Sequence, residues 1–366
     1  MSTLSEIHAF PKLDTINHWK SWKETNAHKY PTIEPLLELI QDKTTHVGIE
    51  VEVENMQRGV RIDDVFWSIK EDNSLRNNGL EFVSWVLVGN QIPYAVLNLM
   101  QALPNEASFS QRTSVHIHVN VRDLTPDDLA KLLLVYLTIE RLLYRFVGAN
   151  RDKNIFCVPL HELGMPEKLF TSLKQIGREP LYQTENTRYS GLNFDPCLKF
   201  GSVEFRQLHG TRDPVRLLTW INLLLCIRKF AIATEMTALI AEILALNTTS
   251  AYKHYAQKIF GDLLMLFPAE TLNTDMELGV VSVKRSMFSN KFKKELSLAA
   301  HPESNARQYI VENYTRHLVA PKRPIEQRFF QPLTAAGGVI NVAPVLARRR
   351  PGHNAFDDIL QVGQNR

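Results

Sequence analysis

Alternation of apolar and polar residues with a period of two marks several strands in the first third of the chain. Residues 47–55, VGIEVEVEN, alternate apolar with acidic positions, and residues 114–121, SVHIHVNV, alternate apolar positions with imidazoles. Residues 79–88, GLEFVSWVLV, are apolar enough to be buried on at least one face. Because successive strand residues point to opposite faces, these segments predict strands with one core face and one polar face.

Helical patterns separate and follow these strands. The longest helix is predicted over 124–148, where Thr125 is placed to cap it and Gly148 to end it. A second helical stretch over 214–247 is expected to break near its middle. Further helices are predicted within 33–41, 93–103, 251–267 and 303–317, and strand patterns return in SGLNF and in SVEFRQL (202–208). This order predicts an α+β fold with a mostly antiparallel sheet backed by long helices.

Composition along the chain suggests three regions. Residues 1–44 predict an N-terminal helical extension, residues 45–320 carry the strands and long helices, and residues 321–366 predict an extended tail with several prolines and Arg348-Arg349-Arg350. The tail could dock an acidic protein partner or be solvated, and the two long helices could back the sheet or form a homo-oligomer interface.

Charge and cysteine content exclude several classes of protein. A formal net charge of +3 over 366 residues argues against a dedicated nucleic-acid coat, and the longest apolar run, around 217–227, is too short to span a membrane. The first residues do not have the pattern of a signal peptide. Cys157, Cys197 and Cys226 are widely spaced without a C-x-x-C motif, which fits a reduced, cytoplasmic compartment and ordinary buried thiols.

The polar faces of the predicted strands carry the candidate chemistry. Side chains at i and i+2 of a strand share a face and lie roughly 6.5–7 Å apart. Three strands carry such polar pairs opposite apolar residues, and a fourth adds one carboxylate after a loop: Glu50/Glu52, His116/His118, Glu204/Arg206, and Glu81 following Asp72. Each pair alone is typical of a solvated sheet face, hydrogen-bonded histidines or a salt bridge. Together they indicate one site. Glu54, which continues the row of acidic residues, could be a third ligand or lie at a solvated edge, and the solvated edge is the favoured interpretation.

A divalent cation would resolve the repulsion within such a group of carboxylates and imidazoles. The surplus of carboxylates over histidines favours Mg²⁺ or Mn²⁺ over a structural zinc. A guanidinium beside the metal suits phosphate oxygens, which it can bind in a bidentate manner. The chain has neither G-x-x-x-x-G-K-[ST] nor G-x-G-x-x-G, so an ordinary P-loop and a dinucleotide fingerprint are both excluded.

Five sequence blocks occur in a characteristic order: G-I-E-V-E, D-N-S-L with G-L-E-F-V-S, T-S-V-H-I-H-V-N, R-Y-S-G-L-N, and S-V-E-F-R. Over roughly residues 46–230 this order resembles the putative amidoligase family, also described as carboxylate–amine ligase-like, of the glutamine synthetase and glutamate–cysteine ligase superfamily. The resemblance implies a curved antiparallel sheet whose concave face binds ATP and two or three Mg²⁺ ions. It implies a reaction in which a substrate carboxylate forms an acyl phosphate with the γ-phosphate and an amine then displaces phosphate.

The resemblance also implies roles for individual residues. The metal ligands would be Glu50, Glu52, Glu81, His116 and Glu204, with His118 nearer the phosphates and Arg206 on the γ-phosphate. Other positions have two interpretations each. Asp72 could deprotonate the amine or cap its loop, and Arg112 could reach the phosphates. Arg188 and Asn193 could hold phosphates or a substrate carboxylate, or form a loop salt bridge. Arg151 and Asn154 resemble a substrate-side loop, although Arg151 could instead satisfy helix carbonyls.

Two other functions stay open on the residues alone. One is a metal-dependent hydrolase or cupin-like oxygenase that uses H-x-H plus Glu and is indifferent to ATP. The other is a non-catalytic, ligase-like scaffold that binds partners. For the ligase, the substrates would be small-molecule or peptide carboxylates and amines, and their choice is expected to depend on loops at 55–70, 150–190 and 270–300.

Overall fold

The computed structural model describes residues 2–56, 60, 62, 64–148, 150–163, 166, 168–170 and 187–287. All of them belong to the first of two compact units of the chain, Met1–Ala320. The predicted tail at 321–366 and the predicted helix at 303–317 lie outside the described residues.

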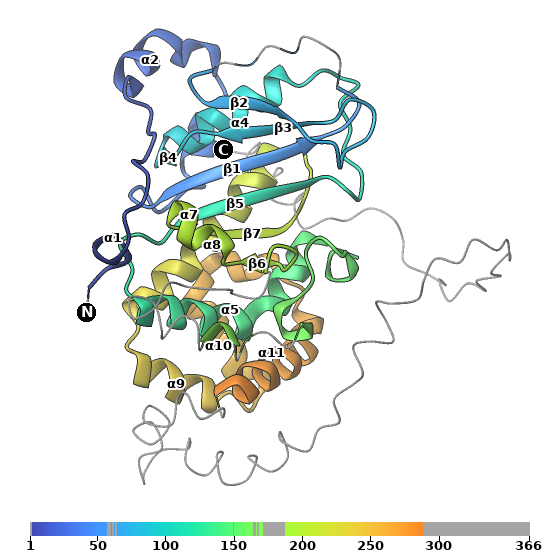
Figure 1. The fold of residues 1–366 in the computed structure, drawn as a ribbon. Coiled ribbons are helices and arrows are strands. Elements are labelled where there is room, and N and C mark those ends of the chain that lie inside the picture. The colour runs from blue at the N-terminus through green and yellow to red at the C-terminus, as the bar shows by residue number, and fades with distance from the viewer. Residues whose placement is uncertain are drawn as a thin grey trace, which may run out of the picture. The chain divides into compact units, whose positions relative to one another are not determined.

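An antiparallel sheet forms the centre of the described part of the chain (Figure 1). Seven strands are described there, in the order β2-β3-β1-β5-β7-β6, with β4 also paired to β1. Their bounds are β1 His46–Val53, β2 Trp67–Glu71, β3 Leu80–Ser84, β4 Leu87–Val88, β5 Ser114–Asn120, β6 Leu192–Asn193 and β7 Ser202–His209. Every neighbouring pair runs antiparallel. The predicted α+β class with a mostly antiparallel sheet is confirmed.

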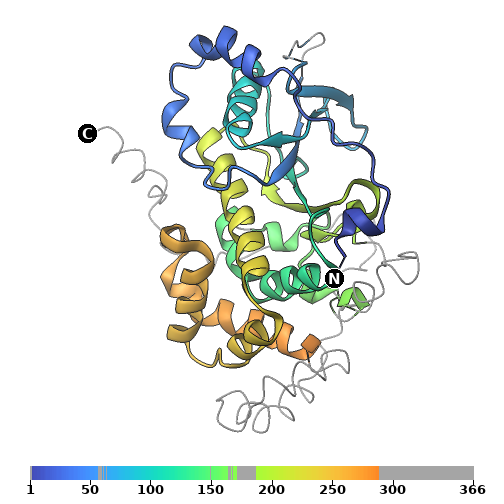
Figure 2. The ribbon, with the colours of Figure 1, turned by 90° about the vertical axis from the view of Figure 1, so that its left-hand side faces the viewer.

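Several helices accompany this sheet, and the two longest pack against its strands and against each other. Their bounds are α1 Leu4–Ile7, α2 Trp19–Asn26, α3 Glu34–Leu37, α4 Gln91–Ala102, α5 Pro126–Val147, α7 Asp195–Phe200, α8 Pro214–Ala233, α9 Met236–Leu244, α10 Thr249–Phe260 and α11 Leu272–Met287. Helix α8 contacts α4, α5 and β5, and α5 contacts β7 (Figure 2). Helices α9, α10 and α11 form a further layer against α5 and α8. No described helix is long and apolar enough to cross a membrane.

The ends of the two long helices follow from their sequences. Thr125 caps α5 by accepting a hydrogen bond from Asp128 N at 3.1 Å, and the Asp128 carboxylate in turn accepts one from Thr125 N at 2.9 Å. The Asp213 carboxylate accepts from two backbone N–H groups in the first turn of α8. The second stretch breaks between Ala233 and Met236, as predicted, and continues as α9.

The period-two pattern separates a core face from a polar face. Ile49, Val51 and Val53 of β1 are fully buried. On β7, Phe205 packs against Tyr136 of α5 with ring centroids 6.0 Å apart. The residues that alternate with these on each strand therefore point to the face away from α5 and α8.

Three elements were not predicted. Strand β2 lies in a segment expected to be a loop, and its residues Ile69 to Glu71 are exposed, which is why WSIKE shows little apolar alternation. Helix α7 is too short for a clear pattern. The expected substrate loop at 270–300 is wrong over 272–287, because α11 is a helix that packs against α5. The strand expected over 79–88 is divided into β3 and β4.

Candidate active site

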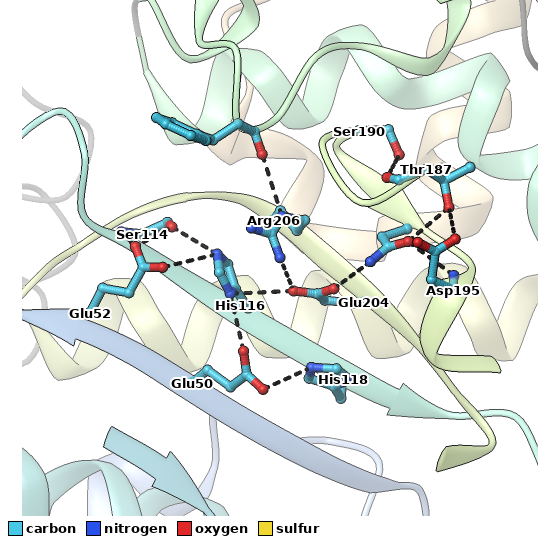
Figure 3. A network of polar contacts seen from close by, with 12 residues as sticks. Glu50, Glu52, Ser114, His116, His118, Thr187, Ser190, Asp195, Glu204 and Arg206 are labelled. Atoms are coloured by element: carbon cyan, nitrogen blue, oxygen red, sulfur yellow. Dashed lines mark hydrogen bonds and ion pairs between the residues drawn. The ribbon is translucent and has the colours of Figure 1, made fainter. Parts of the chain in front are cut away.

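Strand register brings the predicted polar pairs together on one face of the sheet (Figure 3). Because direct partners on adjacent strands share a face, their side chains lie side by side. Glu50 of β1 pairs directly with His116 of β5, and His118 of β5 pairs with Glu204 of β7. On the other side of β1, Glu52 pairs with Glu81 of β3. Residues more than 150 positions apart in the chain therefore form one site.

His116 is the central side chain of this site and is only 3% exposed. Its Nδ1 lies 3.2 Å from Glu50 Oε2 and 3.3 Å from Glu204 Oε1. Its Nε2 lies 2.8 Å from Ser114 Oγ and 3.8 Å from Glu52 Oε1. The two ring nitrogens thus face two different groups of carboxylates.

Ser114 fixes the position of Glu52. The Glu52 Oε2 atom accepts hydrogen bonds from Ser114 N at 2.8 Å and from Ser114 Oγ at 2.7 Å. The other carboxylate oxygen, Oε1, is left facing His116. Ser114 lies at the start of β5 and was not predicted as a site residue, although it precedes the H-x-H pair by two positions on the same face.

His118 lies beside Glu50 at the Ser202 end of the site. Its Nε2 is 3.3 Å from Glu50 Oε1, and its Nδ1 is 3.1 Å from Ser202 Oγ. Its ring also contacts the edge of Phe200, with the centroids 6.5 Å apart, and Phe200 is 55% exposed. His118 is thus adjacent to the central group, with an exposed aromatic ring beside it.

Glu204 and Arg206 hold each other on β7. The Arg206 guanidinium donates to Glu204 Oε1 and, through Nε, to the carbonyl of Phe156 at 3.4 Å. Asn193 of β6 donates its Nδ2 to Glu204 Oε2 at 2.7 Å. Both oxygens of Glu204, which is 4% exposed, therefore have partners inside the protein.

A β-bulge places Arg206 opposite His116. Ile117 pairs with Phe205 and Val115 pairs with Leu208, so two residues of β7 face the single residue His116. Arg151 binds this bulge from behind: its Nε donates to the carbonyl of Gln207 at 2.7 Å and its Nη2 to that of Arg206 at 2.8 Å. At 1% exposure, Arg151 contacts strand carbonyls rather than the helix carbonyls considered from sequence.

The electrostatics of the site divide its carboxylates into two kinds. Burial opposes ionisation of Glu50, but hydrogen bonds from His116 and His118 outweigh it and hold the pKa of Glu50 well below its usual range. Burial likewise opposes ionisation of Glu204, and the charges of His116 and Arg206 lower its pKa. In contrast, burial together with the charge of Glu50 raises the pKa of Glu81 to about 7.

The histidine beside Glu50 shifts in the complementary direction. Burial lowers the pKa of His118, but the hydrogen bond and negative charge of Glu50 outweigh this effect and raise it overall. For Glu81, by contrast, burial and the negative charge of Glu50 outweigh the positive charges nearby. A divalent cation placed near Glu81 would supply compensating positive charge.

These residues fit a hard divalent cation. Two groups each bring ligand atoms within 4.8 Å of one another, and they share His116: Glu50, His116 and Glu204; and Glu52, Glu81 and His116. Carboxylate oxygens with one imidazole are the ligands that Mg²⁺ and Mn²⁺ accept, whereas the described residues of both groups contain no thiolate. His118 belongs to neither group, and its place nearer the phosphates stays a prediction.

Asp72 lies on the loop between β2 and β3, and Arg112, in the segment that precedes β5, binds the same loop. The Asp72 carboxylate accepts a hydrogen bond from Ser74 N at 2.8 Å, and Arg112 donates from Nη1 to the carbonyl of Ser74 at 3.2 Å. The capping interpretation of Asp72 is therefore observed, and a role as a base stays a prediction. Glu54 was expected at a solvated edge, which is wrong: it is 4% exposed and accepts from Arg76 N at 3.0 Å.

Asn154 and Arg188, the remaining predicted substrate residues, contact neighbouring parts of the chain. Asn154 donates to the carbonyl of Gln111 at 2.9 Å and accepts from Phe156 N at 2.9 Å, so it shapes the segment that holds Arg206. Arg188 is exposed and lies over the ring of Tyr189, 5.7 Å from its centroid. Contacts of either residue with a substrate stay predictions.

The cysteines do not contribute to this site as nucleophiles. All three are free, with Cys157 and Cys197 buried. Burial raises the pKa of Cys157 to about 11 and that of Cys197 to about 12, and also raises the pKa of Cys226. Thiols with raised pKa values are poor nucleophiles at neutral pH.

Comparison with known families agrees with this geometry. A family model described as putative amidoligase enzyme matches residues 60–228. The match includes Glu81, both histidines of β5, Glu204 and Arg206, and it begins after Glu50 and Glu52, so it is narrower than the resemblance read from the sequence. No curated protein matches the chain. Residues 60–228 of the chain therefore match the putative amidoligase family.

Proposed function

We propose that this protein is an ATP-dependent carboxylate–amine ligase that forms an amide through an acyl-phosphate intermediate. The observation that supports it most is the union of two cation-binding groups with Arg206 on one sheet face, within a chain whose residues 60–228 match the putative amidoligase family. In the overall reaction a carboxylate, an amine and ATP give an amide, ADP and phosphate. The carboxylate oxygen takes the γ-phosphoryl group, and the amine loses a proton as it displaces phosphate.

The residues of the site suit this anionic reaction. Glu50, Glu52, Glu81, His116 and Glu204 would hold Mg²⁺ or Mn²⁺, which supplies neutralisation of phosphate charge when bound. Arg206 lies next to Glu204 and can donate to phosphoryl oxygens, and His118 can donate to the same group from the other side of Glu50. Arg112 and Arg188 are further candidates for binding phosphates, at the margins of the site.

The charge of the site also favours a ligase over the hydrolase alternative. Four carboxylates and one imidazole fit a hard cation carried by nucleotide phosphates better than they fit zinc, for which nitrogen and sulfur ligands are typical. A firmly bound Zn²⁺ or Fe²⁺ in elemental analysis, with activity independent of ATP, would support the hydrolase instead.

The direct test is ADP release with Mg²⁺ over pools of amino acids, short peptides and amines. We expect release that requires both a carboxylate and an amine. Glu204→Ala and Arg206→Ala should each lower turnover at least about 100-fold, because each removes charge stabilisation at the transferred phosphoryl group. Wild-type rates in either variant, with the fold verified by circular dichroism, would contradict the proposed mechanism.

A further inference from the structure

A buried chain of hydrogen bonds connects Thr187 to Glu204 through the amide of Asn193 (Figure 3). The Asn193 Nδ2 atom donates to Glu204 Oε2 at 2.7 Å, and its Oδ1 accepts from Thr187 Oγ1 at 2.7 Å and from Asp195 N at 2.9 Å. Thr187 is fully buried and Asn193 is 3% exposed. Solvent therefore does not compete for these bonds.

The donors around Asn193 determine which way its amide points. The backbone N–H of Asp195 can only donate, so the amide oxygen must face it and the amide nitrogen must face Glu204. The Thr187 hydroxyl accepts from Phe194 N at 3.0 Å, and its own proton is within reach of Asn193 Oδ1 and, at 3.0 Å, of Asp195 Oδ1. A hydroxyl at this position satisfies a donor and an acceptor at once.

The orientation of Asn193 has a consequence for the metal-binding group. Because Asn193 binds Oε2 of Glu204, the other oxygen, Oε1, is the one that faces His116 Nδ1 at 3.3 Å. That oxygen lies on the side where Glu50, His116 and Glu204 gather their ligand atoms. The geometry of Glu204 thus depends on the orientation of Asn193 and, through it, on Thr187, whose hydroxyl binds Asn193 and not Glu204 itself.

The hydroxyl of Thr187 could instead serve only to close its own loop, but Ser190 already provides the hydrogen bonds that close it. The Ser190 hydroxyl lies 2.6 Å from the carbonyls of both Thr187 and Leu192, and Ser190 N donates to the carbonyl of Thr187 at 2.8 Å. The loop is therefore closed by Ser190 and by backbone groups. The side chain of Thr187 is left to the amide of Asn193 and to the turn at residues 194–195.

We propose that Thr187 is a positioning residue of the metal centre, acting through Asn193 to fix the Glu204 carboxylate oxygen that faces the cation. This inference rests on the metal centre of the proposed function. Groups that orient the ligands of a metal typically change its affinity about 10- to 100-fold when they are lost. Thr187 takes no part in the chemistry itself, because it does not touch the reacting atoms.

The test is the affinity for Mn²⁺ measured by calorimetry on the full chain without nucleotide. Thr187→Val keeps the shape and removes the hydroxyl, and we expect about 10-fold weaker binding. Thr187→Ser keeps the hydroxyl and should bind Mn²⁺ within about 3-fold of the wild-type affinity. Thr138→Val is the matched control, because Thr138 is an equally buried threonine whose hydroxyl donates to the carbonyl of Leu134, away from the site.

Each outcome is decisive. Loss of affinity in Thr187→Val, with retention in Thr187→Ser and Thr138→Val, supports the inference. Wild-type affinity in Thr187→Val, while Glu204→Gln binds weakly, overturns the role of Thr187 and leaves the metal centre standing. Absence of Mn²⁺ binding by the wild type overturns both. If Thr187→Val does not fold, Asn193→Leu tests the same chain of bonds and should also weaken Mn²⁺ binding about 10-fold; unchanged affinity would overturn the inference.

Discussion

His116 and Glu50 are direct partners across β1 and β5, and their side chains meet at 3.2 Å between Nδ1 and Oε2. The opposite ring nitrogen of His116 faces Ser114 and Glu52. One imidazole therefore stands between both groups of candidate ligands. Among the carboxylates of the described residues, His118, two residues later, forms an ion-pair contact with Glu50 alone. The two histidines of the same motif should differ sharply in their contribution to cation binding.

We expect His116→Gln to weaken Mn²⁺ binding more than 10-fold, because it removes a ligand atom that both groups share. His118→Gln is the matched control and should change Mn²⁺ affinity less than about 3-fold, since His118 is in neither group. Titration followed by electron paramagnetic resonance of free Mn²⁺ measures both. Equal losses in the two variants would show that the pair acts as one unit and would contradict this assignment.

The alternation of polar and apolar residues was sufficient to predict which side chains share a face. Glu50, His116 and Glu204 were predicted on polar faces of separate strands because each lies between buried apolar residues. The pattern within a strand carries no information on its register with the next one. The bulge that sets Arg206 opposite His116 is therefore visible only in the structure.

Other parts of the site lacked any sequence pattern. Thr187 lies before β6, a strand of two residues, and its hydroxyl acts through contacts that depend on the path of the loop. Arg151 was singled out because its segment resembles a substrate-side loop, but its carbonyl partners lie 55 and 56 positions away. Strand β2 was missed because an edge strand with exposed residues has no apolar period to detect.

Substitutions at Asp72 separate its two interpretations. Asp72→Asn keeps an oxygen that can accept from Ser74 N and removes the base, whereas Asp72→Ala removes both. Because the observed hydrogen bond is that of a cap, we expect Asp72→Asn to keep ADP release within about 3-fold of wild type and Asp72→Ala to lower it further, with a loss of about 0.5–1 kcal/mol in stability. Rates that fall about 100-fold in Asp72→Asn would instead establish a base.

Replacement of Arg151 by lysine should destabilise the protein and impair the site. A lysine carries one nitrogen and cannot reproduce the two bonds to the carbonyls of Arg206 and Gln207. We expect the free energy of unfolding in urea to fall by about 1.5–3 kcal/mol, the usual range for a hydrogen bond to a charged group. ADP release per folded molecule should fall several-fold, because the bulge no longer holds Arg206 in place.

Arg141→Lys is the control for Arg151. Arg141 binds Asp152, in the same segment, at 3.4 Å and is partly exposed, so this change should cost less than about 1 kcal/mol. If Arg151→Lys lowered stability and turnover no more than Arg141→Lys does, the hydrogen bonds of Arg151 to the bulge would not stabilise the protein or the site.

Lys284 of α11 gives the protein a stability that depends on pH in a region remote from the site. It is fully buried and donates to the carbonyls of Leu244 at 3.2 Å and Leu246 at 3.1 Å, at the end of α9. Burial lowers the pKa of Lys284 to about 7. Between that value and its ordinary pKa of 10.5, the unfolded chain binds a proton that the folded chain releases, so this residue's contribution to stability rises with pH.

Lys284→Met removes this dependence. We therefore expect the stability of the wild type relative to Lys284→Met to increase by about 2 kcal/mol as the pH is raised from 7 to 9, since a full pKa unit corresponds to about 1.4 kcal/mol. The two lost hydrogen bonds add a cost to the variant that does not vary with pH, so only the slope is diagnostic. Urea unfolding of both proteins at pH 7, 8 and 9 measures it. A difference that stays constant over this range, or that falls, would show that the ammonium group remains charged in the folded protein, held by the carbonyls of α9.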